Sequence, residues 1–200
     1  MSVRLSSRAK LTKPSATLAI ASRAKQMRAE GIDVVDFGLG EPDFETPDHV
    51  KEAAIQAIRD GFTRYTPASG IDELKEAIIT KLKRDNGLSY RQEEVIVSCG
   101  SKHSLFNVAE ALFESGDEVI VPAPYWVTYT EQIRLVDACP VIVETREEEG
   151  FHVTRRLVES AITARTKAVL LNSPCNPTGA VILREELEAI AALAIKRDLL

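Results

Sequence analysis

The chain has 200 residues, 44% of them hydrophobic and 28% charged, so it can bury a core and is neither disordered nor fibrous. Its net charge of −5 argues against a general attraction to nucleic acid or anionic lipid, and its longest apolar run, Ala189 to Ile195, is far too short to span a membrane. The three cysteines form no C-x-x-C pair, which favours a reducing compartment, and we expect a cytoplasmic protein.

The N-terminal segment is basic: seven lysines and arginines precede Glu30, the first acidic residue. A start that is rich in arginine and serine and free of acids is typical of an organelle transit peptide. The alternative is a basic arm that stays on the mature protein, and we favour the arm.

Three helices are expected in the first half of the chain. Apolar residues at helical spacing mark Leu18 to Ala29. Thr46-Pro47-Asp48 has the capping hydroxyl, the first-turn proline and the acid of a helix start, and this helix is expected to reach about Asp60. Ile71 to Arg84 is a further amphipathic helix.

From residue 94 onward, strand-like runs alternate with helical patterns. The expected strands are Glu94–Ser98, Glu118–Val121, Val141–Glu144 and Ala168–Leu171. The expected helices are Ser101–Phe113, Tyr125–Val136, Val153–Ala161 and Arg184–Ile195. This alternation predicts an α/β fold, with a mostly parallel sheet covered by helices on both faces. An apolar strand would begin at Arg197–Leu200, and since a domain rarely ends on an unpaired strand, we expect a truncated chain.

Three segments at expected strand ends carry candidate chemistry. Gly100-Ser101-Lys102 lies between a strand and a helix, and the free amides of a helix start suit a phosphate dianion. Trp126, the only tryptophan, follows a proline-rich loop and could stack on a flat heteroaromatic ring. Asn176 lies in Asn172-Ser-Pro-Cys-Asn-Pro-Thr-Gly, where its side chain could bond a phenolate oxygen or a carboxylate. Each segment also has a purely structural interpretation: a plain turn, a core tryptophan and an Asn-Pro turn.

Several other chemistries lack the residues they need. The three histidines (His49, His103 and His152) share no ligand spacing, so no metal site is expected. The two glycine-rich nucleotide-binding motifs and the G-x-S-x-G nucleophile elbow are absent. Basic residues are not interleaved with aromatic ones, so no nucleic-acid partner is expected.

The order and spacing of the motifs resemble class I aminotransferases of pyridoxal-phosphate fold type I, most closely the bacterial aspartate aminotransferases. The motifs are Lys13-Pro-Ser-Ala-Thr, Gly40-Glu-Pro-Asp-Phe, Tyr65-Thr-Pro, Gly100-Ser-Lys, Pro124-Tyr-Trp and Asn172-Ser-Pro-Cys-Asn-Pro-Thr-Gly. The likeness runs from about Leu11 to Leu200 and implies the N-terminal half of such an enzyme. Residues 1–45 would form an N-terminal arm and part of a small domain, and residues 46–200 an incomplete cofactor-binding large domain.

The resemblance implies pyridoxal 5'-phosphate as cofactor, an amino acid and a 2-oxo acid as substrates, and a homodimer. The implied cofactor-binding residues are Tyr65, Gly100, Ser101, Lys102, Trp126 and Asn176. In this scheme the backbone amides from Gly100 to Lys102 hold the phosphate, and Tyr65 reaches the phosphate bound by the partner subunit. Trp126 stacks on the pyridine ring, Asn176 bonds the ring hydroxyl oxygen, and cis peptide bonds precede Pro124 and Pro177.

The resemblance also implies a substrate site. Its residues are Gly40, Lys102, Trp126 and Asn176. Gly40 and Asn176 would help to hold the α-carboxylate, and Lys102, with Ser15 and Thr17 near it, would meet a distal carboxylate. This arrangement favours a dicarboxylic substrate such as aspartate or glutamate.

The lysine that would form the Schiff base is not recognisable. None of the ten lysines lies in the family's Ser-Lys…Gly-x-Arg context, so the polypeptide by itself is expected to be inactive, with no catalytic residue among its 200. Three alternatives stay open: prephenate or aromatic transamination, a carbon–sulfur lyase on the same fold, or a short pseudo-enzyme that binds partners through its sheet.

Overall fold

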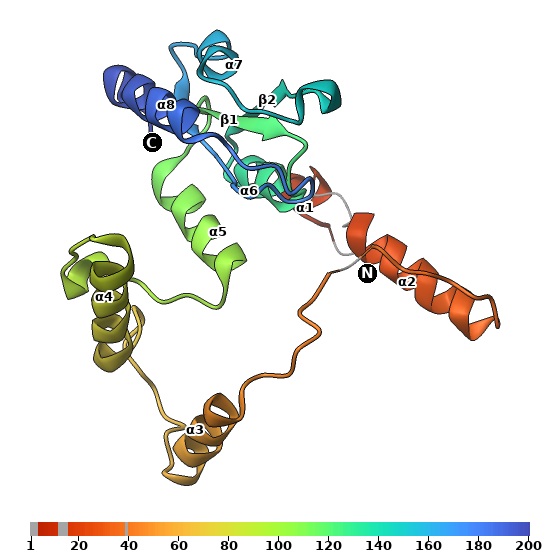
Figure 1. Cartoon of the computed structure of the whole chain (residues 1–200), viewed down its shortest axis with the longest axis vertical. Coiled ribbons are helices and arrows are strands. Elements are labelled where there is room, and N and C mark those ends of the chain that lie inside the picture. Colours follow the sequence, from red (N-terminus) through yellow and green to blue (C-terminus); the bar gives the residue numbers. More distant parts are fainter. Residues whose placement is uncertain (1–3, 12–15, 39) are drawn as a thin grey trace. The chain divides into compact units, whose positions relative to one another are not determined.

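The computed structural model describes residues 4–11, 16–38 and 40–200, which fall into two units. The first unit comprises residues 1–13 and 100–200, and the second unit comprises residues 14–99 (Figure 1). The sequence-based boundary at residue 45, between the arm and the large domain, stays a prediction.

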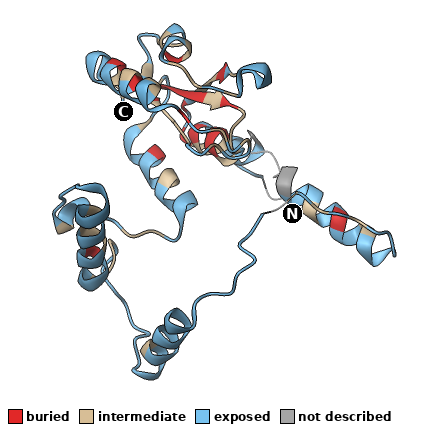
Figure 2. Cartoon of the chain, in the orientation of Figure 1, coloured by how far each residue is buried: buried red, intermediate tan, exposed pale blue. Residues whose placement is uncertain are grey.

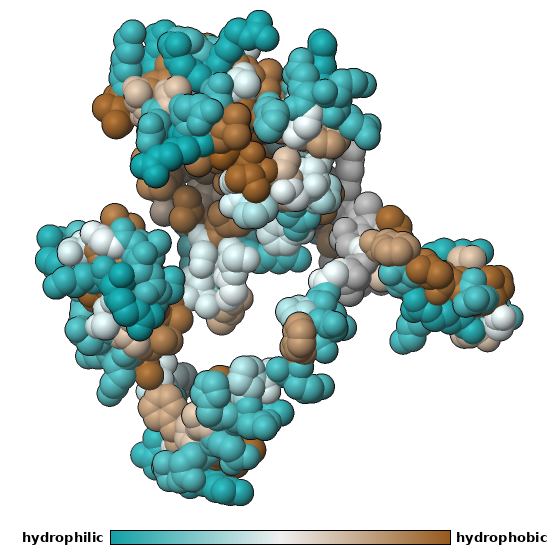
Figure 3. Space-filling view, viewed as in Figure 1, coloured by the Kyte–Doolittle hydropathy of each residue, from teal (hydrophilic) through white to brown (hydrophobic). Residues whose placement is uncertain are grey.

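The second unit contains the three expected helices: α2 (Ala16–Ala29), α3 (Asp48–Arg59) and α4 (Asp72–Asn86). α4 ends at Gly87, which adopts the left-handed φ of 68° that glycine tolerates best. Burial is sparse here, with Phe37 94% exposed and Phe44 87% exposed. Figure 3 shows apolar side chains on the surface of these helices.

The expected strand at Glu94–Ser98 is wrong. The 3-10 turn η1 (Gln92–Glu94) takes up its first residue; Val95, which follows, is extended, and residues 95–98 belong to no sheet. Val97 donates one backbone hydrogen bond to the Ser69 carbonyl at 2.9 Å. A strand needs a continuous ladder of such bonds with a neighbour, and β-forming residues do not create one by themselves.

The first unit is built on a parallel sheet of three strands: β1 (Glu118–Ala123), β2 (Cys139–Glu144) and β3 (Thr166–Val169). The strand order is β2-β1-β3, and both pairings are parallel, as predicted. The connections run through α6 (Thr128–Leu135) and through η2 (Glu147–Glu149) with α7 (Arg155–Ser160). The remaining helices of this unit are α1 (Ser7–Leu11), α5 (Ser101–Leu112) and α8 (Arg184–Arg197).

Helices cover the two faces of the sheet, because alternate residues of β1 point to opposite sides. Val119 and Val121 pack with Ala109 of α5 and Ile133 of α6 on one face. On the other face Ile120 belongs to a second cluster, which is completed by Val143 of β2, Val158 of α7, and Ile190 and Leu193 of α8. Figure 2 shows the resulting concentration of buried residues along the central strand.

Two element boundaries differ from the sequence-based ones. α6 begins at Thr128 instead of Tyr125, because β1 continues through Pro122 to Ala123 and the chain then bends at Pro124 before the helix starts. α8 extends to Arg197, so the strand expected at Arg197–Leu200 is represented only by the last residue. Leu200 donates to the Lys167 carbonyl at 3.0 Å, and its own carbonyl accepts from Val169 at 2.9 Å, both at the edge of β3.

A buried carboxylate ties the amino-terminal end of β1 to that of β3. Glu118 is 5% exposed and accepts hydrogen bonds from the Thr163 hydroxyl at 2.5 Å and from the Arg165 guanidinium. The Thr163 hydroxyl is the largest influence and Arg165 the next, and together they lower the pKa of Glu118 below its ordinary value of 4.5. The ionised carboxylate therefore stabilises the folded state at neutral pH.

We expect the substitution Glu118→Gln to lower Tm at pH 7 and to flatten the decline of Tm in acid. A carboxyl whose pKa is lowered in the folded state contributes stability above its unfolded pKa and loses it as the pH falls through the folded pKa. The difference in Tm between the two proteins should therefore shrink as the pH falls from 7 to below about 4. Calorimetry across this range is the measurement, and Glu149→Gln, at an exposed glutamate of η2, is the control. A Tm difference that is constant over the whole range would contradict this role for the charge.

Candidate functional site

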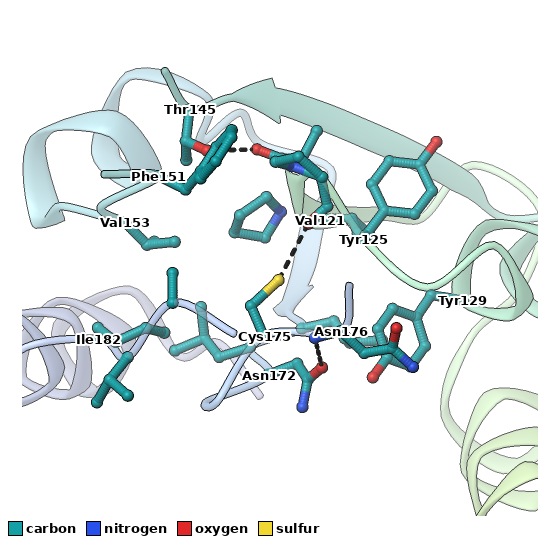
Figure 4. Close-up of a pocket in the computed structure, with 17 residues that line it drawn as sticks. Val121, Tyr125, Tyr129, Thr145, Phe151, Val153, Asn172, Cys175, Asn176 and Ile182 are labelled. Carbon is teal, nitrogen blue, oxygen red and sulfur yellow. Dashed lines mark hydrogen bonds between the residues drawn. The ribbon is translucent and has the colours of Figure 1, made fainter. Parts of the chain in front are cut away.

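The carboxyl ends of the three strands meet at one edge of the sheet, where ligands bind in open α/β folds. A pocket of about 30 Å³ lies there, large enough for a water molecule. Residues from all three strand ends line it (Figure 4). They are Tyr125 and Tyr129 from the region after β1, Thr145 after β2, and Cys175 and Asn176 from the loop after β3.

The start of α5 has the geometry of an anion site. Gly100 has φ 86° and ψ 170°, a conformation that side chains with a Cβ rarely adopt. Its carbonyl accepts from His103 at 3.1 Å and from Ser104 at 3.2 Å, which closes the first turn. The preceding amides, those of Ser101 and Lys102, are the ones that a helix start leaves without helical acceptors. That these amides hold a phosphate stays a prediction.

Lys102 and Trp126 lie side by side. The Lys102 ammonium is 5.1 Å from the centroid of the Trp126 ring, within the range of a cation–π contact. The edge of Tyr129 meets the indole at 5.5 Å and 89°, a T-shaped pair that orients the ring. Gln132 of α6 donates to the Lys102 carbonyl at 2.7 Å and so ties the start of α5 to α6.

Asn176 lies in a tightly hydrogen-bonded loop. Its backbone N–H donates to the Asn172 side-chain oxygen at 2.8 Å, and Gly179 and Ala180 close the turn through the Cys175 backbone. Ser173 accepts from the Ile182 N–H at 3.0 Å. The Asn176 side chain is exposed at the pocket, so its amide is available to a ligand.

The cis bonds expected before Pro124 and Pro177 are confirmed, and a third, Ser173–Pro174, was not expected. All three belong to the segments that follow β1 and β3. A single X-Pro dipeptide carries no sequence mark that distinguishes its isomers, since the surroundings select the isomer.

Burial raises the pKa of the Tyr129 phenol, and the nearby Cys175 adds to that shift. The phenol is therefore neutral at physiological pH. Tyr129, Cys175 and Thr145 were all missed as site residues in the sequence. The usable signal was that Thr145 directly follows an expected strand, at the edge where parallel strands place their ligands.

The other sequence-based site residues belong to the second unit. Gly40 and Tyr65 are both exposed there, with the Tyr65 side chain fully accessible, so their joining to the site stays a prediction. Ser15 and the side chain of Thr17 lie outside the described residues. Within the described ranges no cluster of histidine, cysteine or carboxylate side chains could hold a metal ion, and no helix is long and apolar enough to cross a membrane.

Comparison with known proteins gives consistent matches. The family "Aminotransferase class I and II" matches residues 32–200. The chain is 49% identical to an aspartate aminotransferase of Bacillus sp. (strain YM-2) over 98% of its own length and 50% of that relative. It is 52% identical to the aspartate/prephenate aminotransferase of Thermus thermophilus over 97% of this chain and 50% of the relative.

Solved structures agree with this. The aspartate aminotransferase from Thermus thermophilus with maleate superimposes with a TM-score of 0.95 at 50% identity, over 99% of this chain and 52% of that one. An alanine aminotransferase from Pyrococcus furiosus gives a TM-score of 0.92 at 33% identity, over 98% of this chain and 50% of that one. The expected fold type I is therefore shown, and the chain spans about half the length of the relatives it matches.

Proposed function

This chain belongs to the class I and II aminotransferases, a family that depends on pyridoxal phosphate, and on that premise we propose a specific activity for the whole protein. The protein moves an amino group between aspartate or glutamate and a 2-oxo acid. The observation that carries the proposal is the pairing of Lys102 with Trp126 at the helix start that follows Gly100. It places a cation, an aromatic face and free backbone amides together.

The residues at the sheet edge fit the cofactor. The amides of Ser101 and Lys102 and the positive end of α5 suit its phosphate, and the Trp126 face suits its ring. Asn176 offers an exposed amide to the ring hydroxyl oxygen. When bound, the cofactor supplies an electron sink for the electrons released when the substrate loses its α-proton. The task of this chain is to hold the ring plane, the phosphate and the substrate so that the correct bond breaks.

The substrate proposal rests on charge. The Lys102 ammonium is exposed, so it can leave the indole face for a carboxylate. Gly40 and Asn176 would help to hold the α-carboxylate at the other end of the substrate. The Thermus thermophilus relative was solved with maleate, itself a dicarboxylate.

Prephenate is a second candidate acceptor. A relative from Thermus thermophilus, at 52% identity, carries the name aspartate/prephenate aminotransferase, and one from Aquifex aeolicus, at 50%, is named a probable aspartate/prephenate aminotransferase. Prephenate also has a second carboxylate, so the same Lys102 would serve both substrates.

We further propose that the whole protein is a cytoplasmic homodimer in amino-acid biosynthesis, with Tyr65 reaching the phosphate in the partner subunit. The exposure of Tyr65 supports this, because a fully accessible tyrosine is free to meet another chain. Residues 1–200 alone are proposed to be inactive, since none of their ten lysines has the context of the Schiff-base lysine.

The proposal is tested with the full-length protein. We expect added pyridoxal phosphate to give a protein-bound visible absorbance, and aspartate with 2-oxoglutarate or prephenate to yield oxaloacetate. Residues 1–200, assayed in parallel, should yield none. A full-length protein that neither binds the cofactor nor forms oxaloacetate would refute the proposed function.

A further inference from the structure

The segment between β1 and Trp126 is held from two sides by side-chain donors. Thr145, directly after β2, donates through its hydroxyl to the Ala123 carbonyl at 2.6 Å and through its N–H to the same oxygen at 3.1 Å. Cys175, in the loop after β3, donates its thiol to the Pro124 carbonyl at 3.3 Å. Figure 4 shows both side-chain bonds as dashed lines that reach this segment from different directions.

The segment depends on such donors because of its composition. Pro122 and Pro124 have no N–H, so the chain leaving β1 offers mainly carbonyl oxygens for attachment. Ala123 is 8% exposed, and its carbonyl, which would be costly to bury without a donor, accepts from both the N–H and the hydroxyl of Thr145. The side chains of Thr145 and Cys175, which we call the carbonyl clamp, supply donors where the backbone ladder of the sheet ends.

The carbonyl clamp links two proposed cofactor contacts that lie far apart in the chain. Cys175 directly precedes Asn176, and Pro124 lies two residues before Trp126. The thiol bond therefore spans 51 residues of sequence and joins the loop of the ring-hydroxyl partner to the loop of the ring-stacking tryptophan. Tyr129 lines the same pocket as Cys175 and Asn176 and meets the Trp126 indole with its edge.

We propose that Thr145 and Cys175 are positioning residues, which set the Trp126 ring at a fixed separation from Asn176. What they position rests on the function proposed above, whereas the clamp itself rests on contacts within this chain. Neither side chain needs to touch the substrate or the cofactor. The clamp limits the motion of the loop that contains Trp126. Less conformational entropy of this loop is therefore lost when the cofactor ring binds against it.

The test compares donor-removing with donor-retaining variants of the full-length protein. Cys175→Ala and Thr145→Val remove the side-chain donors, whereas Cys175→Ser and Thr145→Ser retain them. Cys139→Ala is the matched control, because Cys139 is exposed at the start of β2 and its recorded thiol contact is a long 4.0 Å one to the adjacent Pro140. Two quantities are measured: the Kd for pyridoxal phosphate, and the amide hydrogen exchange of residues 121–127 in the cofactor-free protein.

We expect Cys175→Ala to raise the Kd by about three- to tenfold, the equivalent of one ordinary hydrogen bond. Exchange at the Tyr125 and Trp126 amides should accelerate in the same variant. Thr145→Val should have a smaller effect, because the Thr145 N–H still donates to Ala123. The serine variants should restore both quantities, and the Tm of the cofactor-free protein should stay close to that of Cys139→Ala.

Unchanged Kd and exchange in Cys175→Ala would overturn the proposal, as would a failure of Cys175→Ser to restore them. If the unaltered protein binds no pyridoxal phosphate, the proposed function fails. In that case the exchange measurement still decides whether the carbonyl clamp holds residues 121–127.

Discussion

Replacing Lys102 by alanine in the full-length protein is expected to lower kcat/KM for aspartate by about 10- to 100-fold. A charge-assisted bond to a distal carboxylate is worth roughly 1.5–3 kcal/mol, and about 1.36 kcal/mol corresponds to one power of ten. The Lys102 ammonium lies at the start of α5, 5.1 Å from the centroid of the Trp126 ring. The lysine is thus beside the proposed ring site and free to turn toward a carboxylate.

The ratio of two donors makes this test specific. The kcat/KM for phenylalanine should change far less than that for aspartate, because backbone amides rather than the ammonium would hold the phosphate. Lys196→Ala, at an exposed lysine in the last turn of α8, is the control. An equal fall for both donors would assign Lys102 to cofactor support or to the fold, through its contact with Trp126.

The Asn176→Ala variant should bind pyridoxal phosphate about 10- to 100-fold more weakly than the unaltered protein. The amide is proposed to bond a charged ring oxygen, and such a bond contributes roughly 1.5–3 kcal/mol. Truncation at this position leaves the loop intact, because Asn176 binds Asn172 through its backbone N–H, which alanine keeps. Titration of the visible absorbance with pyridoxal phosphate gives the two dissociation constants.

Asn107→Ala, at an exposed asparagine of α5, controls for the loss of an amide elsewhere in the first unit. Amide exchange of residues 121–127 separates this result from the carbonyl clamp, because Asn176→Ala should leave that exchange unchanged. A dissociation constant equal to that of the unaltered protein would show that Asn176 does not contact the ring.

Sequence patterns predicted most elements of the first unit, because their causes are local. Gly100, with its positive φ, separates the expected strand region from α5. Apolar runs mark β1, β2 and β3, and the helices between them dictate parallel pairing. Pairing itself is a non-local property, and for this reason Glu94–Ser98 has the composition of a strand but forms none.

The residues of the candidate site also differ in whether local sequence or the fold reveals them. Gly100, Trp126 and Asn176 could be picked out from the sequence, since each lies in a short motif whose residue types suggest a ligand. The hydrogen bonds of Thr145 and Cys175 could not, because a hydroxyl and a thiol acquire their role only from the carbonyls that they meet, although the position of Thr145 after an expected strand was visible. The contact between Lys102 and Trp126 likewise could not be predicted from the sequence, because the two residues are brought together only by the fold.

Local chemistry along the chain was therefore enough to specify the α/β class, the glycine-started helix α5 and the residue types at the strand ends. Packing of distant segments selected the strand order β2-β1-β3 and the partners of Glu118. The physical reason is the range of the interactions. Propensity, capping and turn preferences act over a few residues, whereas a buried carboxylate or carbonyl is satisfied by whichever donor the fold brings to it.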